Sequence, residues 1–222
     1  LLLGTLSLAG WAIPLGAPAS GEGAAPVKRS ATAHSYMISA ANPHAVEAGL
    51  TMLDRGGSAV DAAIAAQAVL GLVEPQSSGI GGGGFLLHFD PAADRVQAFD
   101  GRETAPAGMD PRLFLTDDGT PMPYMDAALG GAAVGVPGNI AMLERAHEAH
   151  GKLAWADLLQ PAIALATEGF KVSPRLHQQL SRWLGYVRRT DLDIEKLCRA
   201  VDYFFDETGE PVAEGTLLKN PA

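Results

Sequence analysis

The sequence predicts a layered α/β sandwich, and three observations lead to this fold class. Two helices with clear start signals follow one another between residues 42 and 73. A glycine-rich corner and a pair of short strands occupy residues 79–99. A further strand and several more helices are expected between residues 132 and 187. No internal repeat interrupts this order, so the chain is expected to form one layered domain.

Composition limits the classes of function. The 222 residues are enough for a sizeable core, and 47% hydrophobic with 18% charged residues is typical of a globular protein. The net charge of −9 argues against a general surface for nucleic acid or for an anionic membrane. The single cysteine, Cys198, excludes an internal disulfide framework and cannot form a metal cluster alone.

Residues 1–19 form an apolar, uncharged run that ends in small residues. The run resembles the hydrophobic core and cleavage site of a secretory signal peptide, although the initiator Met and the basic first region are absent. Gly4, Gly10 and Pro14 make it a poor transmembrane helix, and it is short for one. Residues 20–26 resemble a flexible linker. We therefore divide the chain into residues 1–26, a clipped signal peptide with its linker, and residues 27–222, and we expect an exported, periplasmic or extracellular protein.

The first helix is predicted after a short strand at residues 36–40. It begins with Asn42 as N-cap and Pro43 at the first helical position, and the glycine pair at residues 56–57 ends it. Four residues at i, i+3, i+4 and i+7 spacing are expected to share one face: Val46, Gly49, Leu50 and Leu53.

The second helix is predicted over residues 59–73. Ser58 and Asp61 resemble a capping box at its start, and Glu74, which precedes Pro75, is expected outside it. The helix is apolar on nearly all sides, so it must be covered on several sides. We expect it to lie between a sheet and other helices.

Four consecutive glycines, residues 81–84, precede two strand-like runs at residues 85–89 and 95–99. Such a run is tolerated where backbones approach closely or adopt positive φ. Aromatic and aliphatic residues bounded by Asp, Pro and Gly predict a hairpin with its turn at residues 90–94. Arg102 comes just after the second strand, so a rigid element could direct its guanidinium into a pocket.

Two sequence motifs that the glycine-rich segment partly matches, a dinucleotide-binding fingerprint and a nucleophile elbow, are not supported by their context. Residues 79–84 satisfy G-x-G-x-x-G, and Asp100 follows about twenty residues later, as in a dinucleotide-binding fingerprint. That fingerprint requires a strand before the glycines and a helix after them, whereas the predicted order here is the reverse. Ser77 and Ser78 follow Pro-Gln rather than the glycine of a G-x-S-x-G elbow, so they are interpreted as turn and capping residues.

Beyond Pro106 the sequence predicts a turn at residues 117–121, a strand at residues 132–136 and a helix from an Asn139 cap to His150. One face of this helix is expected to carry Ile140, Leu143, Ala146 and His147. The two histidines and neighbouring glutamates of the helix lack a third convergent metal ligand, so they are interpreted as a solvated face.

Helical periodicity recurs at residues 155–168, where Gly169 interrupts it. It appears once more at residues 174–187, after Ser173. Residues 204–211 resemble a surface hairpin. These elements complete the expected helical layer.

Three long stretches occur in an order typical of one enzyme family. They are AANPHAVEAGLTMLDRGGSAVDAAIAAQAVLGLVEPQSSGIGGGGFLLHFD, FDGRETAP and AVGVPGNIAMLERAHEAHGKLAWADLLQPAIALATEGFKVSPRL. They closely resemble the gamma-glutamyltransferase family, and the resemblance extends over about residues 34–221. The resemblance implies the N-terminal nucleophile hydrolase fold, an αββα sandwich made as one precursor. It also implies that the precursor cuts itself into a large and a small subunit, whose new N-terminal threonine attacks the gamma-glutamyl amide.

The resemblance implies substrate-binding roles for two residues. Arg102 matches the arginine of the family's R-E-x-A-P segment, which holds the α-carboxylate of the gamma-glutamyl group. A planar guanidinium can bind a carboxylate through two bonds, which lysine cannot do. Glu103 matches the acid beside this arginine and is expected to orient it. The residues alone would favour a structural ion pair for Arg102, which lies between Asp100 and Glu103.

No catalytic residue is expected within this chain. The family's nucleophilic threonine, oxyanion-hole glycines and amino-group ligands belong to the small subunit, and Thr104, Thr116 and Thr120 lie in unrelated contexts. We therefore interpret the chain as the N-terminal part of a large subunit. Because it lacks the nucleophile and the oxyanion site, it should be inactive by itself.

The resemblance also implies the partners. They are glutathione or another gamma-glutamyl donor, an amino acid, peptide or water as acceptor, and the small subunit of the same precursor. No cofactor, metal or nucleic acid is expected. Two alternatives stay open: a cephalosporin-acylase-like or other amidohydrolase, since Arg102 also suits a glutaryl-type group, and a non-catalytic truncated remnant.

Overall fold

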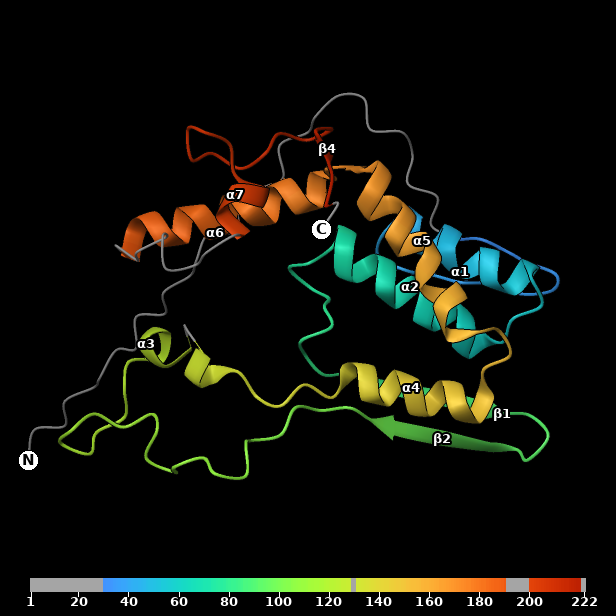
Figure 1. Ribbon diagram of the computed structural model, residues 1–222, viewed down its shortest axis with the longest axis horizontal. Helices are drawn as coiled ribbons and strands as arrows, with labels where there is room; N and C mark the ends of the chain where they lie inside the picture. The colour runs from blue at the N-terminus through green and yellow to red at the C-terminus, as the bar shows by residue number, and fades with distance from the viewer. Residues whose placement is uncertain (1–29, 129–130, 191–199, 221–222) are drawn as a thin grey trace, which may run out of the picture. The chain divides into compact units, whose positions relative to one another are not determined.

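The computed structural model describes three stretches of the chain, residues 30–128, 131–190 and 200–220 (Figure 1). The chain divides into two units, Leu1–Ser35 and Tyr36–Ala222, and the second carries the elements named here. Their order is α1 (Pro43–Asp54), α2 (Ala59–Val73), β1 (Phe85–Asp90), β2 (Arg95–Asp100), α3 (Tyr124–Ala128), the 3-10 helix η1 (Gly131–Ala133), α4 (Asn139–His150), α5 (Trp155–Glu168), β3 (Phe170–Lys171), α6 (Pro174–Thr190), α7 (Ala200–Phe204) and β4 (Leu217–Leu218). The proposed signal peptide and Cys198 lie outside the described residues.

Helices α1 and α2 begin where their capping signals predict. The Asn42 side chain accepts a hydrogen bond from the backbone N–H of His44 at 3.1 Å. Ser58 and Asp61 form the predicted capping box, because each side chain accepts the backbone N–H of the other residue. Gly56, just after α1, adopts φ of +84°, a conformation that suits glycine. The predicted boundaries of both helices are thus confirmed.

The core-facing side of α1 differs from the prediction. Its buried residues are Ala45, Ala48, Gly49 and Met52. The predicted Val46, Leu50 and Leu53 are only half-buried. Small residues allow α1 to lie close to the alanine-rich α2, so side-chain size decides this face as much as hydrophobicity does.

Helix α2 is buried along most of its length and packs mainly on α1, α5 and α4. Among the residues that the structure describes, the prediction that a sheet covers α2 is wrong, since the β1–β2 hairpin packs on α4 instead. Figure 1 shows α4 between α2 and the hairpin. Within the described part of the chain, no helix is long and apolar enough to cross a bilayer.

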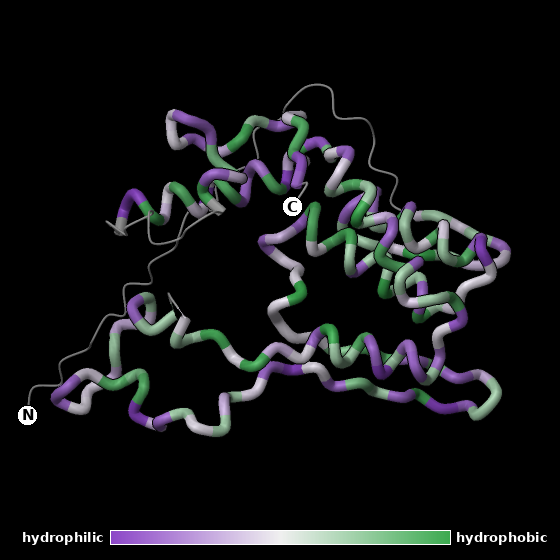
Figure 2. The backbone as a smooth tube through the Cα atoms, in the orientation of Figure 1, coloured by the Kyte–Doolittle hydropathy of each residue, from purple (hydrophilic) through white to green (hydrophobic). Residues whose placement is uncertain are grey.

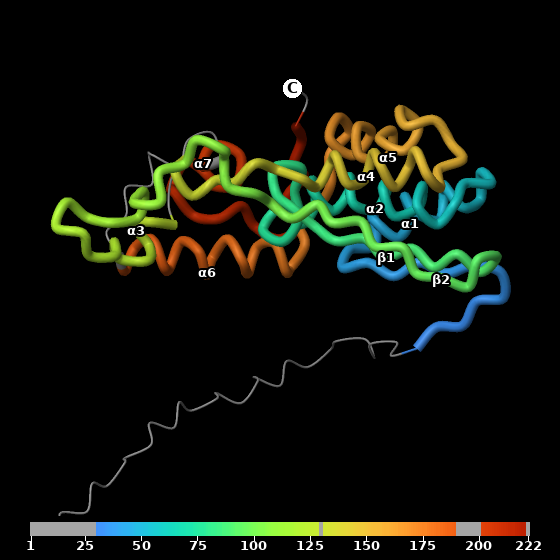
Figure 3. Tube along the Cα trace, turned by 90° about the horizontal axis from the view of Figure 1, so that it is seen from below, coloured from blue at the N-terminus to red at the C-terminus, as the bar shows by residue number. Residues whose placement is uncertain are grey.

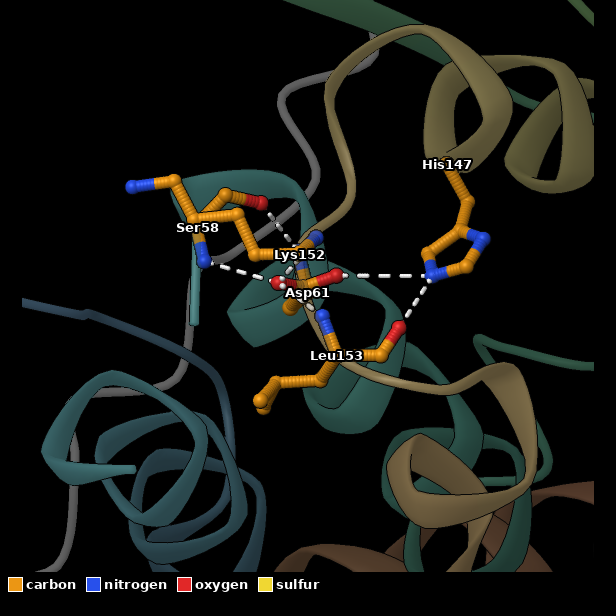
Figure 4. Close-up of polar contacts among 5 residues, drawn as sticks. All are labelled: Ser58, Asp61, His147, Lys152 and Leu153. Atoms are coloured by element: carbon orange, nitrogen blue, oxygen red, sulfur yellow. Dashed lines mark hydrogen bonds and ion pairs between the residues drawn. The ribbon is translucent and has the colours of Figure 1, made fainter. Parts of the chain in front are cut away.

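Asp61 anchors the start of α2 to the loop between α4 and α5 (Figure 4). Its carboxylate is fully buried, and Oδ2 accepts the backbone N–H groups of Ser58, Lys152 and Leu153 at 2.7, 3.0 and 3.2 Å. Oδ1 lies 3.6 Å from Nε2 of His147, which also lies 2.8 Å from the carbonyl oxygen of Leu153. The carboxylate therefore joins three segments of the helical layer.

The predicted solvated face of α4 is wrong for both of its histidines. His147 contacts Asp61, as described above, and its ring meets Trp155 edge to face. The ring of His150 stacks on His88 of β1, with centroids 3.8 Å apart, and lies 3.0 Å from the Gln97 side chain. The contacts of His150 attach the end of α4 to the hairpin, whereas a solvated histidine would make no such contacts.

Strands β1 and β2 form the predicted hairpin and run side by side in Figure 3. Each strand is one residue longer than expected, with Phe85 opposite Asp100 and Asp90 opposite Arg95. Leu86 and Phe99 pack against the core. The opposite face exposes four large apolar side chains, Phe85, Leu87, Phe89 and Val96.

Two other strand predictions are wrong. Residues 36–40 belong to no regular element and pair with no strand in the described ranges; instead Ile38 packs against Gly49 of α1, and the Tyr36 hydroxyl bonds the Asp54 carboxylate. Residues 132–136 begin in η1 and contribute a single bridge, between Val136 and Thr104. A strand requires a partner ladder, and local sequence cannot supply one.

The remaining helices agree better with the sequence. Helix α5 ends where Gly169 adopts φ of +99°. Hydrophobic and hydrophilic residues alternate around α6 in Figure 2, and Ser173 caps its start by accepting the Leu176 N–H at 3.0 Å. The predicted hairpin at residues 204–211 is a turn closed by one bridge. The sequence did not predict the short β3–β4 pair.

Candidate substrate-binding site

The site begins where β2 ends. Gly101 exchanges backbone hydrogen bonds with Gly84, at 3.2 and 3.0 Å, so the ladder continues one pair beyond the strands. A side chain on Gly101 would come within 2.6 Å of Met142 and 2.8 Å of the Gly138 carbonyl. Only glycine therefore allows the strand end to approach α4 this closely. The next residue, Arg102, leaves the ladder, and its backbone N–H donates to Asp100 at 2.9 Å.

Arg102 presents its guanidinium to the surface. Its side chain is 73% exposed, and Nε lies 4.0 Å from Oε2 of Glu103, whose side chain is 40% exposed. An exposed pair at this distance contributes little to stability, typically about 0–1 kcal/mol. The guanidinium therefore lies near one carboxylate and keeps donors for a ligand.

The glycine run packs closely against Glu103. A side-chain carbon on Gly83 would lie 2.5 Å from Oε2 of Glu103 and 2.6 Å from the Gly101 carbonyl. The carbonyl of Gly82 accepts the backbone N–H groups of Gly138 and Asn139, at 3.2 and 3.0 Å. The glycines are therefore needed for close approach, as the sequence predicted.

Asn139 was predicted to cap α4, and this is wrong. Gly138 occupies the N-cap position, and Asn139 is the first helical residue. The buried Asn139 side chain instead donates to the carbonyl of Gly79 at 2.8 Å. The buried face of α4 carries Met142 and Ala146, whereas the predicted Ile140 is 41% exposed.

Two hollows meet at Glu103. The larger, of about 710 Å³, is lined by the glycine run, by Ser77 and Ser78, and by Asn139. The smaller, of about 370 Å³, is lined by Arg102 and by apolar side chains that include Phe114. Glu103 lines both, so Arg102 and Glu103 together can meet a small acidic ligand with an apolar stem.

The three threonines set aside in the sequence have other partners. Thr104 exchanges backbone hydrogen bonds with Val136. Thr116 and Thr120 close a turn around the exposed carboxylate of Asp118. Their hydroxyl groups lower the pKa of Asp118 to about 2. Within the described residues Thr104 therefore forms a β-bridge, and Thr116 and Thr120 form a turn.

The glycine run lies between α2 and β1, so the helix-before-strand order that argued against a nucleotide site is confirmed. Its two serines are engaged in structural contacts. Ser78 Oγ lies 2.8 Å from the Gln67 amide nitrogen, and Ser77 Oγ lies 3.3 Å from the Arg175 guanidinium.

Sequence reasoning missed one residue near the site. Glu74 was treated only as the residue that ends α2, yet its side chain is buried and contacts Asn42, Gln76 and Arg175. The available signal was an acidic residue directly after a wholly apolar helix. Such a residue must either reach solvent or find buried partners.

The arrangement resembles solved structures of gamma-glutamyltranspeptidases. The Helicobacter pylori enzyme superposes with a TM-score of 0.76 and 31% identity over 86% of this chain and 52% of that chain. A cephalosporin acylase from Bacillus halodurans superposes with a TM-score of 0.65 and 26% identity over 88% of this chain and 37% of that chain. The fold is the predicted N-terminal nucleophile hydrolase sandwich, in part.

The family follows from the sequence matches. The family model described as Gamma-glutamyltranspeptidase matches residues 45–222, so the chain belongs to that family. A glutathione hydrolase proenzyme of Bacillus subtilis strain 168 is 38% identical over 82% of this chain and 30% of the relative. Glutathione hydrolase 3 of Arabidopsis thaliana is 40% identical over 83% of this chain and 27% of the relative. The chain thus spans less than a third of these relatives' length.

Proposed function

We propose that the full-length protein transfers or hydrolyses gamma-glutamyl groups of glutathione and related amides. The observation that carries this proposal is the exposed guanidinium of Arg102 just after the β1–β2 hairpin, beside Glu103 and a cavity. The donor's α-carboxylate would accept two parallel hydrogen bonds from Arg102. The names of the glutathione hydrolase relatives support the choice of donor.

Residues 27–222 would then form the N-terminal part of a large subunit. The threonine nucleophile and oxyanion-stabilising groups would come from the small subunit of the same precursor. The word proenzyme in the name of the Bacillus subtilis relative supports processing of this kind. Amino acids, peptides or water would accept the gamma-glutamyl group.

The test is Arg102→Lys in the full-length, processed protein. Lysine keeps the charge but loses the fork, so one or two charge-assisted bonds of about 1.5–3 kcal/mol each should be lost. The KM for a gamma-glutamyl anilide should rise, while self-cleavage, followed on a denaturing gel, stays intact. Arg95→Lys, at the opposite end of β2, is the matched control. Unchanged kinetics for Arg102→Lys would reject the role of Arg102 in binding the donor, and no turnover of the anilide by the wild-type protein would reject the proposed activity.

A second candidate is an acylase of the same family. The structural neighbour from Bacillus halodurans favours it, because that protein is a cephalosporin acylase. A glutaryl group has the same terminal carboxylate as a gamma-glutamyl group but lacks the α-amine. Comparing glutaryl and gamma-glutamyl anilides therefore separates the two activities, and preference for the glutaryl donor would select the acylase.

We also propose export, with loss of residues 1–26. The apolar run ending in small residues supports this proposal. N-terminal sequencing of protein from the periplasmic or extracellular fraction should begin near residue 27. Uncleaved protein recovered only from the cytosol would contradict it.

A further inference from the structure

We infer that Glu74 is a positioning residue for the proposed substrate site. Its buried carboxylate fixes the start of the loop at residues 75–84, the far end of which presses on Glu103 and thereby orients Arg102. This inference rests on the proposed role of Arg102 in binding the donor carboxylate. Glu74 lines neither hollow, so it acts through the loop and not on a ligand.

The carboxylate of Glu74 joins three segments. Oε1 accepts a hydrogen bond from the Asn42 amide, before α1, at 3.0 Å. Oε2 accepts one from the Gln76 amide at 2.6 Å and lies 3.4 Å from Nε of Arg175, in the first turn of α6. The Glu74 side chain is only 2% exposed, whereas that of Arg175 is 51% exposed. A carboxylate buried this deeply holds its partners firmly, because losing one leaves a desolvated charge.

The same partners hold the first residues of the loop. The Glu74 carbonyl accepts the backbone N–H groups of Ser77 and Ser78, at 3.0 and 3.1 Å. Arg175 also reaches the Ser77 hydroxyl, and Gln67 reaches that of Ser78. The entry of the loop is therefore tied to α1, α2 and α6 together.

Residues 79–84 of the loop have almost no side chains of their own that could fix the position of the backbone. Five of the six residues from 79 to 84 are glycine. Their positions depend on backbone bonds to α4 and Gly101, on the Asn139 side chain that donates to Gly79, and on the Glu74 cluster, which comprises Glu74 with Asn42, Gln76 and Arg175. Because Gly83 lies directly against Glu103, movement of the loop would displace that carboxylate and, with it, the orientation of Arg102.

Glu74→Gln in the full-length, processed protein tests the inference. Glutamine keeps the shape but removes the charge that holds Arg175. The KM for a gamma-glutamyl anilide should rise about tenfold with kcat changed less than about twofold, as expected for a misplaced binding group. In an Arg102→Lys background the same substitution should change KM less than about twofold, because the two residues act through one contact.

Asp61→Asn is the matched control, since Asp61 is an equally buried carboxylate at the opposite end of α2. It should lower the Tm but leave KM within about twofold of wild type. If Glu74→Gln yields no processed protein, Arg175→Gln breaks the same ion pair from its exposed side and should raise KM about threefold.

The outcomes separate the two claims. Wild-type protein without gamma-glutamyl turnover rejects the proposed function, and Arg102→Lys with wild-type kinetics rejects the binding role of Arg102; either result rejects this inference as well. If both of those behave as proposed, an unchanged KM for Glu74→Gln, and for Arg175→Gln where it replaces that variant, rejects the inference alone. So does a KM rise that is equally large in the Arg102→Lys background, or that Asp61→Asn reproduces.

Discussion

Charged side chains differ in burial between two regions of the molecule. One region is the helical layer of α1, α2, α4 and α5, and the other is the segment at residues 102–136. Asp61, in the helical layer, is fully buried, and its carboxylate accepts three backbone N–H groups. Arg102, in the segment, is mostly exposed, and its guanidinium lies 4.0 Å from the Glu103 carboxylate. The first arrangement favours stability, whereas the second leaves charged groups able to bind a ligand. Stability and substrate binding should therefore respond to different substitutions.

The largest effect is expected from Asp61→Ala in the full-length protein. It leaves the backbone N–H groups of Ser58, Lys152 and Leu153 without their acceptor and should lower the free energy of unfolding by about 3–5 kcal/mol. Asp157→Ala removes an exposed carboxylate that pairs with Arg55 and should cost about 0–1 kcal/mol. Thermal melts measure both. Similar losses for the two variants would remove the energetic basis of the comparison.

Gly83→Ala probes the junction between the layer and the segment. The added carbon would lie 2.5 Å from Oε2 of Glu103, so the loop or that carboxylate must move. We expect kcat/KM for a gamma-glutamyl anilide to fall about tenfold, equivalent to about 1.4 kcal/mol. Gly81→Ala is the control, because an added carbon there meets nothing within 4 Å. Equal kinetics for both variants would show that contact with Glu103 is unimportant.

The smallest expected effect is the response of the turn at Asp118 to a fall in pH. Hydrogen bonds from Thr116 and Thr120 lower the pKa of Asp118 from 3.8 to about 2. A depressed folded-state pKa means that the stabilising contribution is present above the unfolded pKa and lost as pH falls through the folded value. The methyl NMR signals of the two threonines should therefore stay unchanged between pH 6 and about 4. A transition centred near the ordinary Asp pKa would contradict this description of the turn.

The sequence predicted the helices well because their signals are local. Asn42 with Pro43, and Ser58 with Asp61, define two helix starts within a few residues of chain. Residues 36–40 and 132–136 were mistaken for strands because β-forming composition does not identify a partner. The capping signal at Asn139 misled for a similar reason, since its side chain serves a glycine carbonyl sixty residues away.

The candidate site was predictable only in part. Arg102 and Glu103 came from resemblance to a family motif, while the residues alone favoured an ion pair. The Glu74 cluster joins residues 42, 76 and 175, and no local pattern announces contacts of that range. Tertiary packing decides which acidic residue is buried with partners and which stays exposed.

The most direct test of whether Arg102 binds the donor's α-carboxylate changes the donor as well as the protein. Wild-type and Arg102→Met proteins, full-length and processed, would be compared on a gamma-glutamyl anilide and on the same donor with its α-carboxylate converted to a carboxamide. If Arg102 binds that carboxylate, wild type should prefer the natural donor by about 10–150-fold in kcat/KM, and Arg102→Met should lose most of this preference. A variant that still discriminates between the donors as strongly as wild type would show that another group binds the carboxylate.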